Sequence, residues 1–198
     1  MNPLGVAFAA LTLLAQSRIA TVLSIGDGDT LRVRNGSRTQ TVRLACIDAP
    51  ETSQAPHGSR ARQQLQALAP VGSSVELRIK ATDRYGRSVA ELSRSGRNLN
   101  QALVASGAAF VYWQFISGCD RQTYSRLENE ARLRGLGVWG VRGGVTRPWD
   151  YRSAQRRTGR RYTCKQIGSY AQAQLLLRQG HCYLDGDGDG EACEGLRG

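Results

Sequence analysis

The sequence predicts a small β-barrel with helices inserted between its strands and appended after them, followed by a smaller module at the C-terminus. Residues 18–142 contain five short stretches rich in aliphatic and β-branched residues, bounded by turn signals, and three stretches with helical periodicity. The charge also changes along the chain. Residues 18–161 hold 24 cationic and 11 anionic residues, a net charge of +13, whereas residues 162–198 hold three cationic and five anionic residues, a net charge of −2. A length of 198 residues excludes a large multidomain protein.

Turn residues separate the expected strands, which are 19–25, 30–34, 39–47, 74–81 and 88–93. A Gly-Asp-Gly-Asp run at 26–29 divides the first two strands. Asn35-Gly36, a dipeptide typical of β-hairpins, divides the second and third. The last two flank a turn at 84–87. We therefore expect two sets of antiparallel strands.

Apolar residues spaced three or four apart predict three helices in the same segment. They include Ala61 and Leu65 before Pro70, Leu99 and Leu103 after an Asn98 cap, and Tyr124 and Ala131 before Gly135. The resulting order is β-β-β-α-β-β-α-α. A five-stranded barrel with three helices in these places has the architecture of an OB-fold.

The N-terminal residues 1–17 are expected to be a signal peptide. Residues 4–15 are uncharged and largely apolar, and Ala15 and Ser17 fit the small-residue pattern of a cleavage site. A short buried helix or an uncleaved anchor are the alternatives. No apolar run reaches the ~20 residues of a membrane span, which disfavours an integral membrane protein. The signal-like segment predicts a protein that is secreted, periplasmic or at the cell surface, and we expect it to be a monomer.

A basic linker is expected at 143–161, between the barrel at 18–142 and the C-terminal module at 162–198. It is rich in Gly and Arg, contains Pro148 and shows little apolar periodicity. We interpret it as a solvated spacer. The alternative is a basic arm that contacts the phosphates of a nucleic acid.

Arginine dominates the charge of this chain. The formal net charge is +11, and 25 of the 27 cationic residues are arginine. Such a chain attracts polyanions, which include nucleic acid, anionic lipid and cell-wall polymers. Nucleic acid is favoured because the planar guanidinium binds phosphate through two hydrogen bonds.

Five cysteines cannot all pair within one chain, and none forms a CxxC motif, so a zinc ribbon is disfavoured. Cys46 lies in an apolar strand-like run and is expected to be a small core residue. The other four, Cys119, Cys164, Cys182 and Cys193, allow three complete pairings, and disulfides suit an exported protein.

Carboxylates gather where the first and third expected strands end. Asp27 and Asp29 lie in the turn after the first strand, and Asp48 and Glu51 follow the third. The intervening Pro50 restricts the backbone, so the chain turns sharply and aims both of the latter acids at one point. Hard oxygen ligands of this kind suit Ca²⁺ or Mg²⁺.

Arg43 lies within an apolar strand, where a charge needs an anionic partner. A structural salt bridge to Asp27 or Asp48 is one interpretation. Strict alternation places Arg43 and Asp48 on opposite faces, so their convergence requires a bulge or a strand end between them. With that condition met, Arg43 and Arg87 can hold phosphate oxygens, while Glu51 orients or deprotonates a water.

These residues lie in segments that resemble the staphylococcal nuclease family over about residues 19–140. The resemblance rests on five ordered segments, which are 27–30 (DGDT), 43–52 (RLACIDAPET), 83–87 (DRYGR), 99–107 (LNQALVASG) and 135–139 (GLGVW). It implies an OB-fold barrel with three helices that hydrolyses phosphodiesters of DNA and RNA with Ca²⁺ as the cofactor.

The resemblance also implies roles for individual residues around the metal ion. Asp29 and Asp48 match calcium ligands, together with the backbone carbonyl of Ala49, which replaces a threonine. Asp27 and Thr30 match residues that support these ligands.

Further matches concern the reaction and the substrate. Glu51 matches the general base, and Arg43 and Arg87 match clamps on the phosphate. Arg84 and Tyr85 match contacts to a terminal phosphate, with arginine in place of lysine.

Tyr112 matches a base-stacking tyrosine. Phe110 keeps a ring without the hydroxyl, and core packing is the alternative for it and for Trp113. The loop at 53–58 is shorter than in the family.

The C-terminal segment begins like an EF-hand loop, with acids at Asp185, Asp187 and Asp189. The ending differs, because Leu196 stands where a bidentate glutamate is required and the nearest acid is Glu194. The pattern instead resembles the Excalibur calcium-binding module, which implies a second Ca²⁺. A solvated acidic tail is the alternative.

Such a short module buries little core and needs a covalent staple, for which Cys164 and Cys193 are the favoured pair. Cys182 then remains for Cys119 or for another molecule.

The leading hypothesis is an exported, calcium-dependent nuclease of DNA and RNA with little sequence specificity. A catalytically silent OB-fold module that only binds nucleic acid is the alternative. A surface protein with an incidental barrel is a third hypothesis, which does not require Arg43, Glu51 and Arg87 together.

Overall fold

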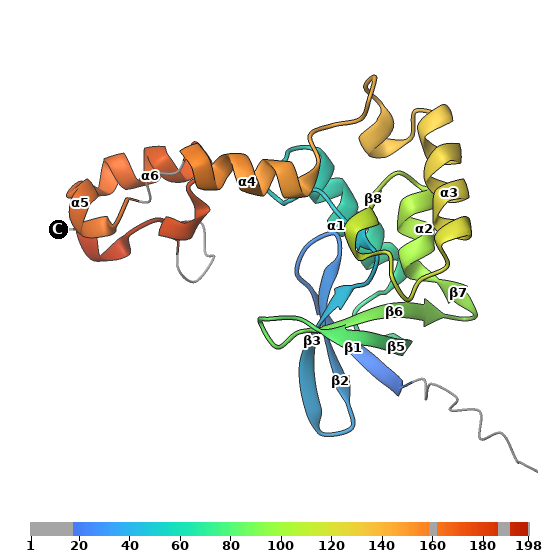
Figure 1. The fold of residues 1–198 in the computed structure, drawn as a ribbon. Coiled ribbons are helices and arrows are strands. Elements are labelled where there is room, and N and C mark those ends of the chain that lie inside the picture. The colour runs from blue at the N-terminus through green and yellow to red at the C-terminus, as the bar shows by residue number, and fades with distance from the viewer. Residues whose placement is uncertain (1–17, 159–161, 186–190, 198) are drawn as a thin grey trace, which may run out of the picture.

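The computed structural model describes residues 18–158, 162–185 and 191–197 (Figure 1). The expected signal peptide at 1–17 and the predicted calcium ligands Asp187 and Asp189 lie outside these residues.

Five strands form a closed barrel, as predicted (Figure 1). They are β1 (Arg18–Ile25), β2 (Thr30–Asn35), β3 (Arg38–Leu44), β5 (Ser74–Thr82) and β6 (Ser88–Arg94). Neighbours are antiparallel in the order β3-β2-β1-β5-β6, and β3 closes the barrel by pairing in parallel with β6. Every second side chain of β2 is buried, at Leu31 and Val33, which is the alternation expected of a barrel wall.

The third expected strand, 39–47, is divided in the structure. β3 ends at Leu44, and Cys46 has a φ of 66°, a left-handed conformation that interrupts the strand. The chain then forms β4 (Ile47–Asp48), which pairs with β8 (Phe110–Val111) instead of continuing the barrel. A short β7 (Arg97–Asn98) extends the edge of β6.

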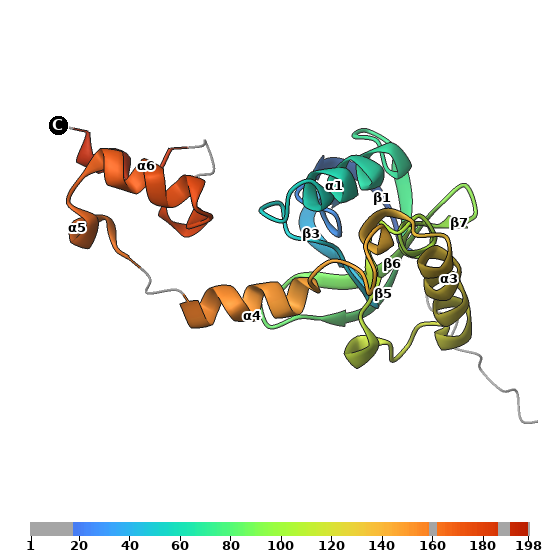
Figure 2. The same cartoon turned by 90° about the horizontal axis from the view of Figure 1, so that it is seen from above.

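Three helices accompany the barrel, also as predicted, and Figures 1 and 2 show them along one side of it. They are α1 (His57–Leu68), α2 (Leu99–Ala105) and α3 (Arg121–Leu133), and two 3₁₀ turns follow β8, η1 (Trp113–Phe115) and η2 (Gly137–Trp139). The predicted Asn98 cap is present, because its side chain accepts a hydrogen bond from the Gln101 N–H.

A disulfide links Cys46 to Cys119, which corrects the expectation that Cys46 is a simple core residue. The bond joins the interruption after β3 to the segment before α3. A second disulfide joins Cys164 and Cys193, the pair favoured from the sequence. Cys182 is free and exposed.

Beyond the barrel, the segment expected to be a spacer contains a helix, α4 (Pro148–Thr158). In both views, α4 extends away from the barrel (Figures 1 and 2). The C-terminal residues form the short helices α5 (Cys164–Ile167), α6 (Tyr170–Arg178), η3 (Cys182–Leu184) and η4 (Glu194–Leu196).

These C-terminal elements have a small core of their own, which includes Ala173, Leu184 and Ala192. The Gln174 side chain hydrogen-bonds both the N–H and the carbonyl of Ala192. Of the predicted calcium loop, the structure describes Asp185, directly after η3, and Glu194, at the start of η4.

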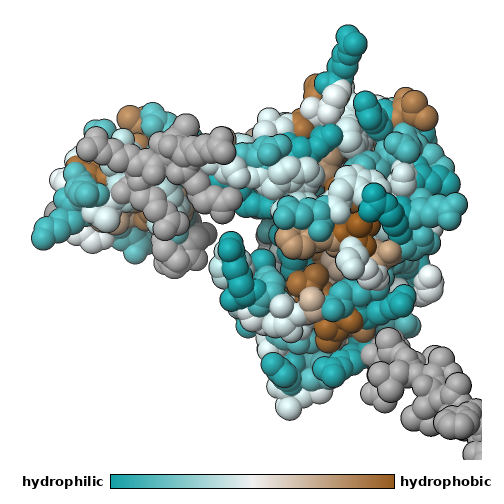
Figure 3. Space-filling view, in the orientation of Figure 1, coloured by the Kyte–Doolittle hydropathy of each residue, from teal (hydrophilic) through white to brown (hydrophobic). Residues whose placement is uncertain are grey.

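Hydrophilic side chains cover most of the described surface on the face drawn in Figure 3. None of the helices built from described residues is long and apolar enough to cross a membrane.

Candidate active site

The turn between β1 and β2 places Asp29 inside the protein. Its backbone N–H donates to Asp27 Oδ1 at 3.0 Å, and the Thr30 hydroxyl donates to Asp29 Oδ1 at 3.2 Å. A Cβ atom at Gly28 would lie 2.6 Å from the Cβ atoms of Ala49 and Ala61, so glycine lets this turn pack closely. Both residues predicted to support Asp29 therefore contact it.

Strand β4 carries Asp48 to the same place. The Ala49 N–H donates to Asp29 Oδ2 at 2.7 Å, and the Leu44 N–H donates to the Asp29 carbonyl at 2.8 Å. Asp29 and Asp48 are both fully buried, at 1% and 0% exposure. Two carboxylates, one from the β1–β2 turn and one from β4, thus lie within one buried cluster.

Arg43 joins these two carboxylates. Its guanidinium lies 2.6 Å from Asp29 Oδ1 and also donates a short hydrogen bond to Asp48 Oδ1. The strand end at Leu44 and the left-handed Cys46 supply the break that strict alternation required between Arg43 and Asp48. Although burial lowers the pKa of Arg43, the two aspartates raise it overall, so the guanidinium stays charged.

The buried cluster disfavours further negative charge. Burial raises the pKa of Asp29 well above its ordinary value, and Asp27 and Asp48 add to this effect, while Arg43 and the Ala49 N–H oppose it. An added cation beside Asp29 would therefore favour its ionised form.

Glu51 lies at the edge of this cluster, with its side chain 30% exposed. Its backbone N–H donates to Gln54 Oε1 at 2.9 Å. A Cβ atom at Gly58 would lie 1.9 Å from the Glu51 carbonyl oxygen, so the start of α1 touches the Glu51 backbone directly. Glycine at 58 is thus required for this placement.

Arg152, which sequence reasoning missed, contacts both Asp48 and Glu51 from α4. Its Nη2 lies 2.6 Å from Asp48 Oδ2 and its Nη1 lies 3.2 Å from Asp48 Oδ1 and 2.5 Å from Glu51 Oε1. Burial lowers the pKa of Arg152, but its bonds to the two acids outweigh this and raise it. Pro148, followed by Asp150 in the first turn, was the available sequence signal for a helix start here.

Arg87, predicted to clamp phosphate, pairs with Asp83 instead of with these acids. Its Nε lies 2.7 Å from Asp83 Oδ2, and its backbone N–H donates to Asp83 Oδ1 at 2.9 Å. Arg84 and Tyr85 lie exposed in the same β5–β6 turn, where the Arg84 guanidinium donates to the Tyr85 hydroxyl at 2.7 Å.

Tyr112 is half-buried and stacks on Trp149 of α4, with ring centroids 4.9 Å apart and an interplanar angle of 1°. Phe110 is completely buried and packs edge-on against Trp139, so it is a core residue, the alternative left open for it. Trp113 is 37% exposed and donates its indole N–H to Glu128.

The donor chemistry of Asp29 and Asp48 fits a hard divalent cation, because both are carboxylates and the cluster disfavours further negative charge. Within the described ranges, no three His, Cys, Asp or Glu side chains are grouped closely enough to hold an ion. A cation at the two aspartates would therefore need backbone, water or substrate oxygens. At Ala49 the N–H is used by Asp29, and a role for its carbonyl stays a prediction.

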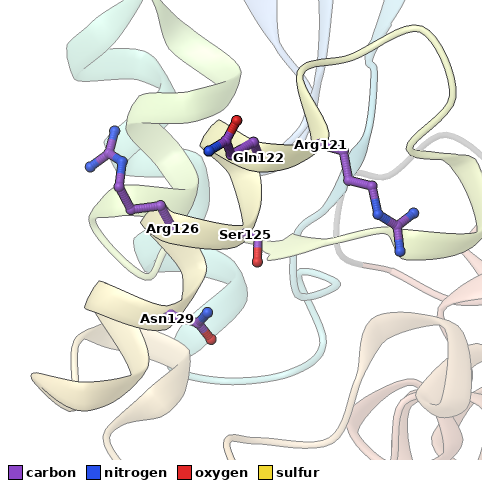
Figure 4. Close-up of a pocket in the computed structure, with 5 residues that line it drawn as sticks. All are labelled: Arg121, Gln122, Ser125, Arg126 and Asn129. Carbon is purple, nitrogen blue, oxygen red and sulfur yellow. The ribbon is translucent and has the colours of Figure 1, made fainter.

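A separate shallow hollow lies on α3, away from these acids. It is lined by Arg121, Gln122, Ser125, Arg126 and Asn129. Figure 4 shows Arg121 and Arg126 pointing away from each other, so the two cations do not converge on one ligand.

Comparisons with known proteins find nuclease relatives of this chain. A family model described as staphylococcal nuclease homologue matches residues 41–141, from within β3 to just beyond η2, so α4 lies outside the match. A micrococcal nuclease of Shigella flexneri is 40% identical over 144 residues, which cover 68% of this chain and 80% of the relative.

Two more distant relatives carry similar names. An uncharacterized endonuclease of Escherichia coli O157:H7 is 34% identical over 132 residues, which cover 66% of this chain and 82% of the relative. A staphylococcal-like nuclease of Arabidopsis thaliana, CAN1, is 30% identical over 115 residues, which cover 58% of this chain and 34% of the relative.

Proposed function

The chain belongs to the staphylococcal nuclease family, and from this premise we propose that it is an exported, calcium-dependent nuclease that hydrolyses DNA and RNA with little sequence specificity. The observation that carries the proposal is the convergence of Asp29, Asp48 and Glu51 around the guanidinium groups of Arg43 and Arg152.

In this proposal, Glu51 is the general base. Its carboxylate accepts a proton from a water whose oxygen attacks the phosphorus, and the bond from phosphorus to the leaving ester oxygen breaks. The exposure of Glu51 at the edge of the cluster supports this role, because water and substrate can reach it. Arg43, held by the two aspartates, presents positive charge to the phosphate oxygens.

Asp29 and Asp48 are the proposed calcium ligands, with the Ala49 carbonyl. Calcium, when bound, supplies positive charge that stabilises the developing negative charge on the phosphate. Arg87 contacts Asp83 through Nε, so its two Nη groups are the ones proposed to reach the same phosphate.

Tyr112, Arg84 and Tyr85 are the proposed contacts to the rest of the substrate. A tyrosine ring stacks on any base, which suits an enzyme without sequence preference. The two disulfides are compatible with export, and the disulfide-linked C-terminal elements are proposed to hold a second Ca²⁺ at Asp185, Asp187, Asp189 and Glu194.

Incubation of the full chain with plasmid DNA and with RNA tests this proposal. We expect cleavage with Ca²⁺ and none with a chelator, and Glu51→Gln is expected to lower the rate by about 10²- to 10⁴-fold, the range typical of a lost general base. Arg87→Ala is expected to lower the rate as well, because it removes a guanidinium proposed to bind the phosphate.

Glu130→Gln and Arg126→Ala are the matched controls, since this exposed pair lies on α3 away from the acids. Their rates should equal that of the unchanged chain. Binding of nucleic acid without cleavage at any Ca²⁺ concentration would instead identify a silent binding module.

A further inference from the structure

The first turn of α4 covers the groups to which the proposed function assigns metal and substrate. Arg152 engages both carboxylate oxygens of Asp48 and one oxygen of Glu51. Asp48 Oδ1 also accepts from Arg43, so both of its oxygens are already held by guanidinium groups. A cation that binds Asp48 must compete with Arg152 for these oxygens.

The same turn covers the aromatic ring proposed to bind a nucleobase. The Trp149 ring lies parallel to Tyr112 at 4.9 Å, a stacked arrangement that a base would otherwise adopt. Trp149 and Arg152 are three positions apart in a helix, so they project from one face of α4. One helical face thus reaches the acids and the stacking ring together.

Two hydrogen bonds hold this part of the chain against the loop after Glu51. The Gln54 side chain donates to the Thr146 carbonyl at 2.9 Å, and the Tyr151 hydroxyl donates to the Ser53 carbonyl at 3.4 Å. Both contacts are long-range, because the first joins two residues that are 92 positions apart along the chain and the second joins two that are 98 apart. The arrangement is therefore an interaction between two distant segments rather than a local turn.

We propose that residues 146–152 are an intramolecular competitor for the active site, in which Arg152 takes the place of the divalent cation and Trp149 the place of a nucleobase. Ca²⁺ and nucleic acid bind when this segment withdraws, and bound ligands keep it withdrawn. The proposal rests on the proposed nuclease function, and the charge at the acids supports it. The guanidinium supplies one positive charge to Asp48 and Glu51, and a divalent ion supplies two.

If Arg152 only assisted the reaction, its contact with Glu51 would be explained, but its contact with Asp48 and the stacking of Trp149 on Tyr112 would not. It would leave the Asp48 oxygens available to a cation and the Tyr112 ring available to a base. Both are covered at once here. Competition accounts for the three contacts together, and it lowers the apparent affinity for each ligand by the fraction of molecules in which the segment is withdrawn.

Calorimetric titration with Ca²⁺ alone tests the first half of the proposal. Arg152→Gln in the full chain is expected to bind Ca²⁺ at the barrel about tenfold more tightly, because loss of a half-buried ion pair removes ~1.4 kcal/mol of competition. Each protein is compared with its Asp29→Asn counterpart, so that heat from the C-terminal elements is subtracted. Asp29 suits this purpose because its ion pair is with Arg43 and not with Arg152.

Arg126→Gln is the charge-matched control and should leave the barrel affinity unchanged. An unchanged or weaker barrel affinity in Arg152→Gln would overturn the proposal. A fall in kcat together with unchanged Ca²⁺ binding would identify Arg152 as a positioning residue for Glu51.

Anisotropy of a fluorescent oligothymidylate in excess chelator tests the second half. Trp149→Leu is expected to bind it severalfold more tightly, because the Tyr112 ring becomes available for stacking on a base. Leu133→Ala, which shortens an exposed apolar side chain at the end of α3, is the control. Equal or weaker binding by Trp149→Leu would contradict the proposal.

The two proposals fail in different ways. Absence of cleavage and of barrel Ca²⁺ binding in every variant rejects the proposed nuclease function, and the oligothymidylate measurement then decides the competition at Tyr112. Normal calcium-dependent cleavage with unchanged affinities in both variants rejects only the competitor.

Discussion

Among the residues that the structure describes, buried charged side chains lie in two separate places. One is the cluster of Asp29, Asp48 and Arg43 described above. The other lies on β5 and β6, where Glu91 accepts hydrogen bonds from Lys80 at 2.8 Å, Asn98 at 2.9 Å and Tyr124 at 3.0 Å. Burial raises the pKa of Glu91, but these donors, led by Lys80, outweigh it and hold the pKa below its ordinary value.

Glu91→Gln is therefore expected to lower the free energy of unfolding at pH 7 by ~3 kcal/mol, because Lys80 would keep its hydrogen bond to the Gly118 carbonyl but lose its carboxylate partner in a largely buried position. A carboxyl group whose pKa is lowered by folding stabilises the folded state at pH values above the ordinary glutamate pKa. This contribution is lost as the pH falls through the folded-state pKa. Urea denaturation should show the difference between the two proteins narrowing at acidic pH.

Glu76→Gln is the control for this prediction. Glu76 lies on the same strand as Lys80 but is exposed, so its substitution should change the free energy of unfolding little at any pH. A difference between the unchanged chain and Glu91→Gln that stays constant from neutral to strongly acidic pH would contradict the role assigned to Glu91.

The Cys46–Cys119 disulfide holds the turn between β3 and β4, beside the candidate active site. It closes a loop between residues 73 positions apart and holds the turn that precedes Asp48. The Tyr112 N–H also donates to the Cys46 carbonyl at 2.9 Å. The bond thus ties the turn before Asp48 to the segment that follows the Tyr112 position.

Replacement of both cysteines, Cys46→Ser with Cys119→Ser, is expected to lower the free energy of unfolding by ~4 kcal/mol, because a long loop is freed in the unfolded state. Urea denaturation under non-reducing conditions measures this loss. Cys182→Ser is the matched control, since this cysteine is free and exposed, and it should leave stability unchanged. Equal stability of all three proteins would show that the bond does not form.

Helix α4 shows where local patterns stop being informative. Residues 143–161 lack apolar periodicity because α4 packs through Trp149 and through ion pairs of Arg152, not through an apolar stripe. Its partner Asp48 is 104 positions away along the chain. The sequence supplied only a helix start at Pro148, which is a weak signal among so many glycines and arginines.

Charge acts on the scale of the whole molecule. Residues 18–161 carry a net charge of +13, and hydrophilic side chains dominate the visible described surface (Figure 3). This net positive charge attracts a polyanion at long range, and salt weakens the attraction.

Binding of a single-stranded oligonucleotide in chelator should therefore weaken steeply with salt. The logarithm of the binding constant is expected to fall linearly with the logarithm of salt concentration, with a slope of about −0.7 for each phosphate contacted. Anisotropy titrations at several salt concentrations measure this slope. A response that does not change with salt would mean that the basic surface does not contact phosphates.

The sequence by itself determined the five barrel strands, apart from the end of the third, together with the three helices beside them and the turns that carry Asp29 and Glu51. It could do so because alternation, helical spacing and Gly, Asn and Pro turn signals act between residues that are close along the chain. Alternation of side chains also indicated that Arg43 and Asp48 could meet only if a bulge or a strand end lay between them. The structure has a strand end there, at Leu44.

Only the tertiary structure decided that Cys46 pairs with Cys119, that Arg87 pairs with Asp83, and that Arg152 and Trp149 of α4 contact Asp48, Glu51 and Tyr112. Each of these outcomes is a choice among several partners of suitable chemistry. That choice depends on how the barrel, α3 and α4 are placed in space, which no spacing along the chain expresses.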